Sequence, residues 1–442
     1  MKIAWFTPLA RHSAIGRVSA SVVRELAATA TVHLWHPATP DPRPVPVPTI
    51  PFSDTETVDI DLLKKYDLVV YNLGNHLAYH EAIFELALRL PGLCILHDFV
   101  MQHFFISYFF KKLRRPELYM ASMEKHYGDE GRRVATMVAG GHASTFLSSD
   151  APLRYPLFEE AAAGACGVLV HSEWARRRVA PSLLCPVGRL HLPYEIEEPR
   201  EAMTRAELGL RDDRLLVVTV GHINSNRRVA SVLRVLAADD GLRNPVKYVV
   251  VGAREPQCDR ELHELIRHHR LEGTVQLAGR VSDARLAAYL HHADLCVNLR
   301  WPTFESGSAS LAEEMLYGKP VIVTDAGCYS EIPDDCVWKI SPQRELEELA
   351  VALRKLVSDS QARQALGSRA RDFAEKHFRP SQYAAGLLRF AWEVRNFRPV
   401  LEMADRLGDL LQQMGIGAGA PIVSELSRTC AELFGEPDEQ RA

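Results

Sequence analysis

Two glutamates, Glu305 and Glu313, lie eight positions apart on either side of a short run rich in serine and glycine. Residues 306–310 are typical of a loop that turns into a helix, and residues 311–317 are good helix formers that end at Gly318. Small side chains leave the backbone N–H groups of a helix start open, and the partial positive charge there suits a phosphate. The segment therefore combines an acid before a helix, a predicted phosphate cradle and a second acid within the helix.

Two sets of short apolar strands must position these residues. Near-continuous runs of Val, Ile and Leu between helical patterns indicate parallel sheets that are covered on both faces. The first set is 3–7, 32–35, 68–72, 93–97 and 168–171, and the second is 215–221, 248–252, 275–277, 295–299 and 321–324. The fold class is therefore α/β, with two Rossmann-like, doubly wound domains. Binding sites in such sheets open at the carboxyl ends of the strands, so two facing domains predict one cleft between them.

With its flanks, the two-glutamate segment resembles the E-x7-E segment of glycosyltransferase family 4, retaining enzymes with the GT-B fold that use a nucleotide-sugar donor. Residues 293–308, ADLCVNLRWPTFESGS, are similar to the strand and loop that lead into that motif, and residues 318–335, GKPVIVTDAGCYSEIPDD, to its continuation. The resemblance implies that Glu305 contacts the donor sugar and that Glu313 holds the ribose hydroxyls. An ordinary βαβ unit with two solvent-facing glutamates is the alternative for an isolated spacing of this kind.

A basic loop in the second domain is a further phosphate candidate. Strand 215–221 is followed by a loop that begins at His222. The loop ends at Arg227 and Arg228, where a helical pattern begins. Cations at a helix N-terminus oppose the helix dipole unless an anion lies between them. The family resemblance places Arg228 where a lysine commonly grips the donor diphosphate, with Arg227 sharing the role and His222 at a position that is commonly arginine. Two exposed arginines on a solvated loop are the alternative.

Ends of other strands supply the remaining candidates. His97 ends strand 93–97, where the family commonly places a histidine that touches the donor sugar, although a structural histidine fits the pattern too. Arg300 follows strand 295–299, and Gly16 lies in the first βα turn. The catalytic candidates are His97, Arg228 and Glu305, and the donor-binding candidates are Gly16, His222, Arg227, Arg228, Arg300, Glu305, Ser306, Gly307, Ser308, Ser310, Leu311 and Glu313.

Composition and charge exclude several classes of protein. A length of 442 residues suggests two or three domains, and a net charge of -4 gives no basic field for nucleic acid. Eight cysteines without a C-x-x-C pair indicate neither a zinc ribbon nor a disulfide scaffold, so a reducing cytoplasmic location is expected. The one D-x-D, Asp59 to Asp61, precedes a helical stretch and predicts an acidic helix start. The resemblance implies transfer without a metal or another cofactor.

The domain plan has three parts. The resemblance implies an acceptor-side domain at residues 1–194 with an insertion at 99–155, a donor domain at residues 195–378, and C-terminal helices at residues 379–442, the first of which crosses back to the N-terminal domain. A proline-bounded stretch, PYEIEEP at 193–199, predicts the hinge.

Two segments leave the protein's partners open. The insertion contains FVMQHFFISYFFKKLRR, which fits either a peripheral contact with the inner face of the membrane or an aromatic helix face packed into its own domain. No apolar run reaches spanning length. Two amphipathic patterns within residues 396–442 suit packing or a homo-oligomer.

The sequence therefore predicts a bacterial-type, retaining glycosyltransferase that moves a sugar from a nucleoside-diphosphate donor to a hydroxyl of a glycan, a lipid-linked or a protein acceptor. The resemblance implies same-face displacement, in which the departing phosphate helps to deprotonate the acceptor. Two alternatives remain open. A sugar-nucleotide epimerase of the same fold would bind the donor and need no acceptor, and an inactive glycosyltransferase-like partner subunit would keep the fold without turnover.

Overall fold

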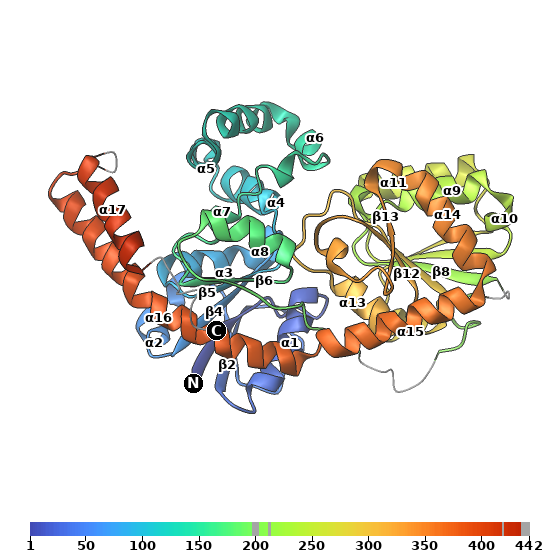
Figure 1. Cartoon of the computed structure of the whole chain (residues 1–442), viewed down its shortest axis with the longest axis horizontal. Helices are drawn as coiled ribbons and strands as arrows, with labels where there is room; N and C mark the ends of the chain where they lie inside the picture. Colours follow the sequence, from blue (N-terminus) through green and yellow to red (C-terminus); the bar gives the residue numbers. More distant parts are fainter. Residues whose placement is uncertain (197–202, 211–213, 418–419, 435–442) are drawn as a thin grey trace.

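A computed structural model of the chain describes residues 1–196, 203–210, 214–417 and 420–434, and it contains two parallel β-sheets (Figure 1). The N-terminal sheet has seven strands in the order β3-β2-β1-β4-β5-β6-β7. Its strands are β1 (Lys2–Phe6), β2 (Thr31–Pro37), β3 (Thr49–Phe52), β4 (Leu68–Leu73), β5 (Leu93–Leu96), β6 (Gly167–Val170) and β7 (Val187–Arg189). The helices α1 (Ala14–Leu26), α2 (Ile60–Leu63), α3 (Leu77–Arg89) and α8 (Glu173–Val179) connect them.

The C-terminal sheet has six strands in the order β10-β9-β8-β11-β12-β13. They are β8 (Leu215–Val220), β9 (Val246–Val251), β10 (Val275–Gly279), β11 (Leu295–Asn298), β12 (Val321–Thr324) and β13 (Trp338–Ile340). The helices are α9 (Val229–Ala238), α10 (Asp240–Arg243), α11 (Pro256–His268), α12 (Asp283–His292), α13 (Ala309–Leu316), α14 (Glu345–Ser358) and α15 (Ser360–His377). Two doubly wound α/β units are thus confirmed.

The strands that the sequence did not predict are β3, β7 and β13. All three are edge strands of three or four residues. An edge strand pairs on one side only, so its residues need not form a continuous apolar run. The ten predicted strands all form, and all but β10 lie in the interior of their sheet, where they pair on both sides.

Between β5 and β6 the chain forms a helical lobe from α4 (Gln102–Ser107), α5 (Pro116–Met137), α6 (Ala143–Leu147) and α7 (Phe158–Ala161), which projects from the N-terminal sheet (Figure 1). Phe104 and Phe105 are fully buried and lie edge-on to Phe84 of α3, with ring centroids 5.3 and 5.4 Å apart. This packing supports the domain-core interpretation of the aromatic segment. Across the described part of the chain, every helix is too short or too polar to cross a bilayer.

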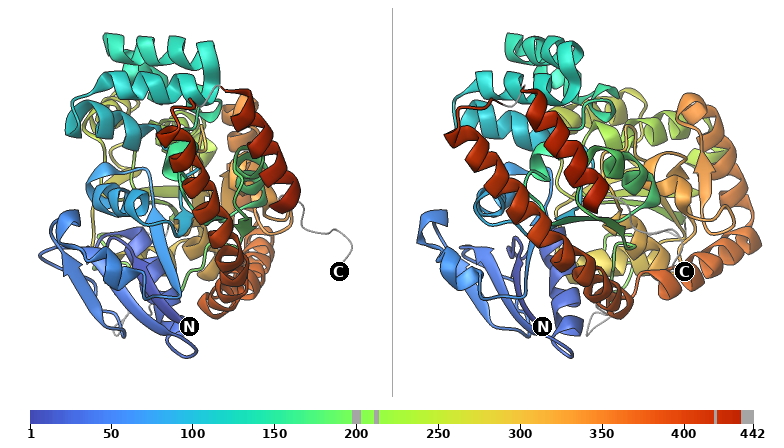
Figure 2. Two further views of the ribbon diagram at one scale, coloured as in Figure 1. Left: turned by 90° about the vertical axis from the view of Figure 1, so that its left-hand side faces the viewer. Right: turned by 60° about the vertical axis from the view of Figure 1, so that its left-hand side comes forward.

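The C-terminal helices extend beyond the second sheet. The 34-residue helix α16 (Pro380–Gln413) packs against α1, and α17 (Pro421–Phe434) returns alongside it (Figure 2). Buried Leu387 and Ala391 lie on the packed side of α16, and Phe390 lies directly against Gly188 of β7. The α16 helix therefore runs from the C-terminal domain across the N-terminal one. Of the hinge predicted at 193–199, residues 197–199 lie outside the described residues.

Candidate active site

The two domains meet where β5 and β11 end. The N–H of Phe99 donates to the carbonyl oxygen of Phe304 at 2.8 Å, and the N–H of Ser306 donates to the carbonyl oxygen of His97 at 2.9 Å. The hydroxyl of Ser306 donates to the carbonyl oxygen of Leu96 at 2.7 Å. The serine-rich loop before α13 is therefore fixed to the carboxyl end of a strand in the opposite domain.

The start of α13 is built as the sequence predicts. Ser308 is the N-cap, and its Oγ accepts from the N–H of Leu311 at 3.2 Å. Gly307 lies against the N-terminal domain, since a Cβ added there would come within 2.7 Å of the Cβ of His171. The first N–H groups of a helix have no partner in the preceding turn, so this end of α13 suits an anion.

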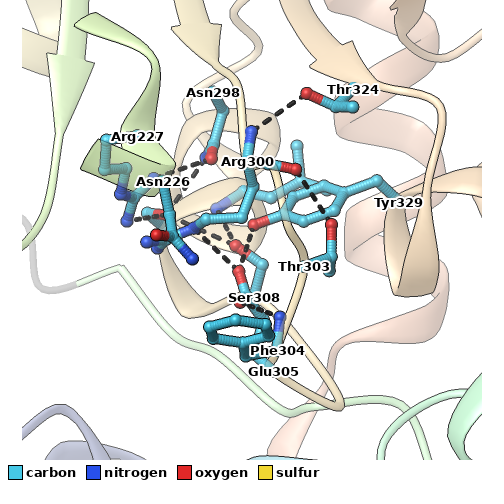
Figure 3. Close-up of polar contacts among 12 residues, drawn as sticks. Asn226, Arg227, Asn298, Arg300, Thr303, Phe304, Glu305, Ser308, Thr324 and Tyr329 are labelled. Atoms are coloured by element: carbon cyan, nitrogen blue, oxygen red, sulfur yellow. Dashed lines mark hydrogen bonds and ion pairs between the residues drawn. The ribbon is translucent and has the colours of Figure 1, made fainter. Parts of the chain in front are cut away.

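Glu305 is held by two neighbours in the same domain. Its carboxylate lies 2.9 Å from Nε of Arg300 and accepts from the hydroxyl of Tyr329 at 2.7 Å (Figure 3). Burial opposes ionisation, but Arg300 and Tyr329 outweigh it and lower the pKa of Glu305. Asp98 forms a backbone bridge with Glu305, and burial raises the pKa of Asp98 to about 6. An ionised carboxylate fixed in this way is suited to orient sugar hydroxyls.

Arg227 is nearly enclosed, with 4% of its surface exposed. Its Nη1 donates to Oδ1 of Asn298 at 2.8 Å and its Nη2 donates to Oγ of Ser310 at 3.1 Å (Figure 3). Gly221, at φ 121°, leaves room for this guanidinium, because a Cβ there would come within 2.2 Å of Nη2. Burial lowers the pKa of Arg227 to about 10, which keeps it charged at neutral pH. Arg227 therefore places a positive charge at the first turn of α13.

Arg228 has a different partner. Its backbone adopts φ 53°, and its Nε donates to both carboxylate oxygens of Glu345 at 2.9 Å. His222 is mostly exposed and lies 3.5 Å from Glu255. Of the predicted basic residues in this loop, the structure brings Arg227 to α13, and it holds Arg228 against the start of α14 instead.

Glu313 faces the N-terminal domain. One of its carboxylate oxygens lies 3.4 Å from Nη1 of Arg17, the residue that follows Gly16 on α1. Burial raises the pKa of Glu313, and Arg17 opposes that shift. A cavity of about 230 Å³ beside Arg17 and Tyr194 extends to Asp283 at the start of α12. Glu313 thus contacts Arg17, one of the residues that line this cavity.

The two predicted residues of the N-terminal domain are closely packed. The ring of His97 is buried, with Nε2 3.0 Å from Oδ1 of Asn72 and Nδ1 3.2 Å from Nε2 of His171. Burial lowers the pKa of His97, so the ring is neutral. Position 16 requires a glycine, because a Cβ there would come within 2.4 Å of the carbonyl oxygen of Pro8. The ring contacts of His97 all lie within the N-terminal domain, and its carbonyl oxygen is the atom that reaches Ser306 of the C-terminal domain.

The structure gathers most of the predicted donor-binding residues around the N-terminus of α13. Figure 3 shows Arg227, Arg300, Glu305 and Ser308 among them. His222 and Arg228 lie outside this cluster, beside Glu255 and Glu345 respectively. Sequence reasoning missed Asn298, Tyr329 and Arg17. The end of β11 and the position after Gly16 were available signals for Asn298 and Arg17, whereas Tyr329 lies 24 residues after Glu305 and carries no such signal. Within the residues that the structure describes, no group of three His, Cys, Asp or Glu side chains could hold a metal ion.

Comparison with solved structures defines the class of fold. The chain is similar to the sucrose-phosphate synthase of Thermosynechococcus elongatus, with a TM-score of 0.61 and 17% identity over 89% of this chain and 99% of that one. It is also similar to Anabaena HepE in complex with UDP, with a TM-score of 0.59 and 18% identity over 88% and 99%. A third similar structure is WaaG, a glycosyltransferase involved in lipopolysaccharide biosynthesis, with a TM-score of 0.56 and 17% identity over 87% and 98%. The chain has the GT-B fold.

One family model matches part of the sequence. Residues 201–373, which include Arg227, Glu305 and α13, match the model for glycosyl transferases group 1. No curated protein matches the sequence.

Proposed function

We propose that this protein is a glycosyltransferase that moves a sugar from a nucleoside-diphosphate donor to a hydroxyl group of an acceptor, with retention of the anomeric configuration. The observation that carries the proposal is the site around α13. Arg227 lies at the first turn of this helix, and the ionised carboxylate of Glu305 lies just before it. The match of residues 201–373 to glycosyl transferases group 1 supports it, as do the UDP and UDP-glucose complexes of similarly folded HepE.

Each part of the donor then has a candidate partner. The diphosphate lies between Arg227 and the N–H groups at the start of α13, where the positive charge is fixed before the donor arrives. Glu305 orients the sugar hydroxyls, and Glu313 accepts from the ribose hydroxyls. His97 acts through the junction, because its carbonyl oxygen holds Ser306 and both of its ring nitrogens have partners.

In the proposed reaction the acceptor oxygen attacks the anomeric carbon on the face from which the diphosphate departs. The bond from that carbon to the phosphate oxygen breaks, and the acceptor proton passes to the departing phosphate. Catalysis comes mainly from positioning and from stabilisation of the leaving group's charge. Because Arg227 and α13 supply this charge, we propose that transfer needs no metal and that turnover persists in EDTA.

Thermal denaturation with UDP, GDP, ADP, TDP and their sugars tests donor binding, since a ligand that binds only the native state raises Tm. Release of the nucleoside diphosphate from the sugar nucleotide that binds then tests turnover. We expect one nucleotide to raise Tm and its sugar to be consumed. Binding without consumption would indicate an inactive subunit, and isomerisation of the sugar without its transfer would indicate an epimerase.

A further inference from the structure

A second buried acid lies beside the proposed phosphate site. Glu314 follows Glu313 on α13 and is fully buried, as is Asn298 at the end of β11. Oε2 of Glu314 accepts from Nδ2 of Asn298 at 2.7 Å, and Oε1 has no hydrogen-bond partner among the described residues. Burying a carboxyl group whose second oxygen has no hydrogen-bond partner lowers the stability of the fold, so the presence of Glu314 here calls for an explanation.

Asn298 connects this carboxyl to the arginine. Its Nδ2 also donates to Oγ of Ser310 at 3.0 Å, while its Oδ1 accepts from Nη1 of Arg227 at 2.8 Å. An amide presents two donors on one side and an acceptor on the other, so its partners decide which way it points. Oε2 of Glu314 accepts from Nδ2, and Arg227 can only donate, so the two contacts together turn Oδ1 toward Arg227. Rotation of the amide would bring Nδ2 against the guanidinium, where two donors would face each other.

We propose that Glu314 is a positioning residue of the phosphate site, which orients Arg227 toward the first turn of α13 through the amide of Asn298. The inference rests on the proposed function, because its effect is measured on a nucleoside diphosphate. Glu314 does not touch the ligand. It fixes the guanidinium before binding, so the donor need not order this side chain itself.

The protonation of Glu314 sets the charge of the cluster. Burial raises the pKa of Glu314 to about 8, while Asn298 and Arg227 oppose the shift. The other charged or titratable groups that face it are Arg300 beyond β11, Glu313 on α13 and the buried thiol of Cys296 on β11. With Glu314 neutral, Arg227 keeps a full positive charge for the diphosphate. Ionisation at higher pH places a negative charge beside Arg227 and weakens its attraction for an anion.

The test compares Glu314→Leu with Glu314→Gln in the full-length protein. Glutamine keeps an oxygen that accepts from Asn298 and mimics the protonated acid, whereas leucine removes that acceptor. Calorimetry measures Kd for the diphosphate that binds the wild type most tightly among UDP, GDP, ADP and TDP, and for its parent nucleoside. We expect the leucine variant to bind the diphosphate at least about tenfold more weakly and the nucleoside equally well, and glutamine to restore binding to within about threefold.

A pH series provides the readout that a purely structural role would not change. Wild-type affinity for the diphosphate should fall as pH rises from 7 through about 8, the pKa of Glu314, and the glutamine variant should show no such fall. This comparison uses only the wild type and Glu314→Gln, so it can be made even if the leucine variant does not fold.

Three results would overturn the inference alone: diphosphate binding by folded Glu314→Leu at wild-type strength, equal losses for diphosphate and nucleoside, or the same pH profile in wild type and Glu314→Gln. Absence of binding of all four diphosphates to the wild type would overturn the proposed function and this inference with it.

Discussion

Replacing Arg227 tests which of two adjacent arginines binds the diphosphate. Arg227 is 4% exposed and already forms hydrogen bonds at 2.8 and 3.1 Å to Asn298 and Ser310, so its charge is weakly screened and its direction is fixed. A hydrogen bond to a charged group contributes about 1.5–3 kcal/mol net. Arg227→Met should therefore raise Kd for the nucleoside diphosphate by about 10- to 100-fold and leave Kd for the nucleoside unchanged.

The matched control removes the neighbouring charge. Arg228 is paired with Glu345, whose side chain is 5% exposed, so the double variant Arg228→Met/Glu345→Met removes both charges and leaves neither buried without a partner. The Kd of this double variant for the diphosphate should stay within about threefold of wild type, since charges that do not contact the diphosphate are strongly screened by solvent and salt. Calorimetry at one ionic strength measures both variants, and circular dichroism and Tm check their folding. A large loss in the Arg228 double variant with none in Arg227→Met would refute the assignment and restore the one expected from sequence.

Three further substitutions test the rest of the site. Glu305→Gln should lower kcat by at least about 100-fold with the nucleoside-diphosphate Kd near wild type, because a sugar-positioning group acts chiefly in the transition state; full turnover would reject that role. Glu313→Gln should weaken nucleoside and diphosphate alike, by about 1–3 kcal/mol in calorimetry, and an unchanged nucleoside Kd would exclude ribose binding. Glu314→Gln should make the protein more stable than the wild type, by a margin that increases as pH rises. The folded state keeps the proton of Glu314 up to a pKa of about 8, while the unfolded chain releases it near 4.5, so wild-type stability falls between these values and the variant's does not. At pH 7 the variant's advantage should be on the order of 3 kcal/mol, and denaturant titrations at pH 5 and 7 that show the same difference at both would contradict the buried, neutral acid.

The sequence predicted the elements of the site because their signals are local. Ser308 caps α13 and Gly318 ends it at φ 66°, as the serine and glycine in the pattern indicate. Asp59 likewise caps α2, accepting from the N–H of Asp61 and of Leu62. Strands in the middle of each sheet were found from their apolar runs, whereas the short edge strands β3, β7 and β13 carry no comparable run.

The pairing of side chains could not be predicted in the same way. Arg227 and Arg228 are adjacent residues of the same type, yet their side chains point to different partners. The left-handed backbone at Arg228 turns its side chain toward Glu345, which lies 117 residues further along the chain. Glu314 lies on a helix whose pattern gives no sign that an acid is fully buried, and its partner Asn298 comes from a different element. Such contacts depend on how β8, β11 and α13 pack, which no local spacing encodes.

The proposed mechanism requires that the anomeric configuration is retained, so the configuration of the first product is the decisive measurement. Proton NMR can follow the anomeric signal while the protein acts on an α-linked sugar nucleotide, with water as acceptor when no other is supplied. Same-face displacement should release the α-anomer first, which then mutarotates, and Glu305→Gln should release it at least about 100-fold more slowly. Release of the β-anomer first would contradict the same-face displacement, and with it the proposed mechanism.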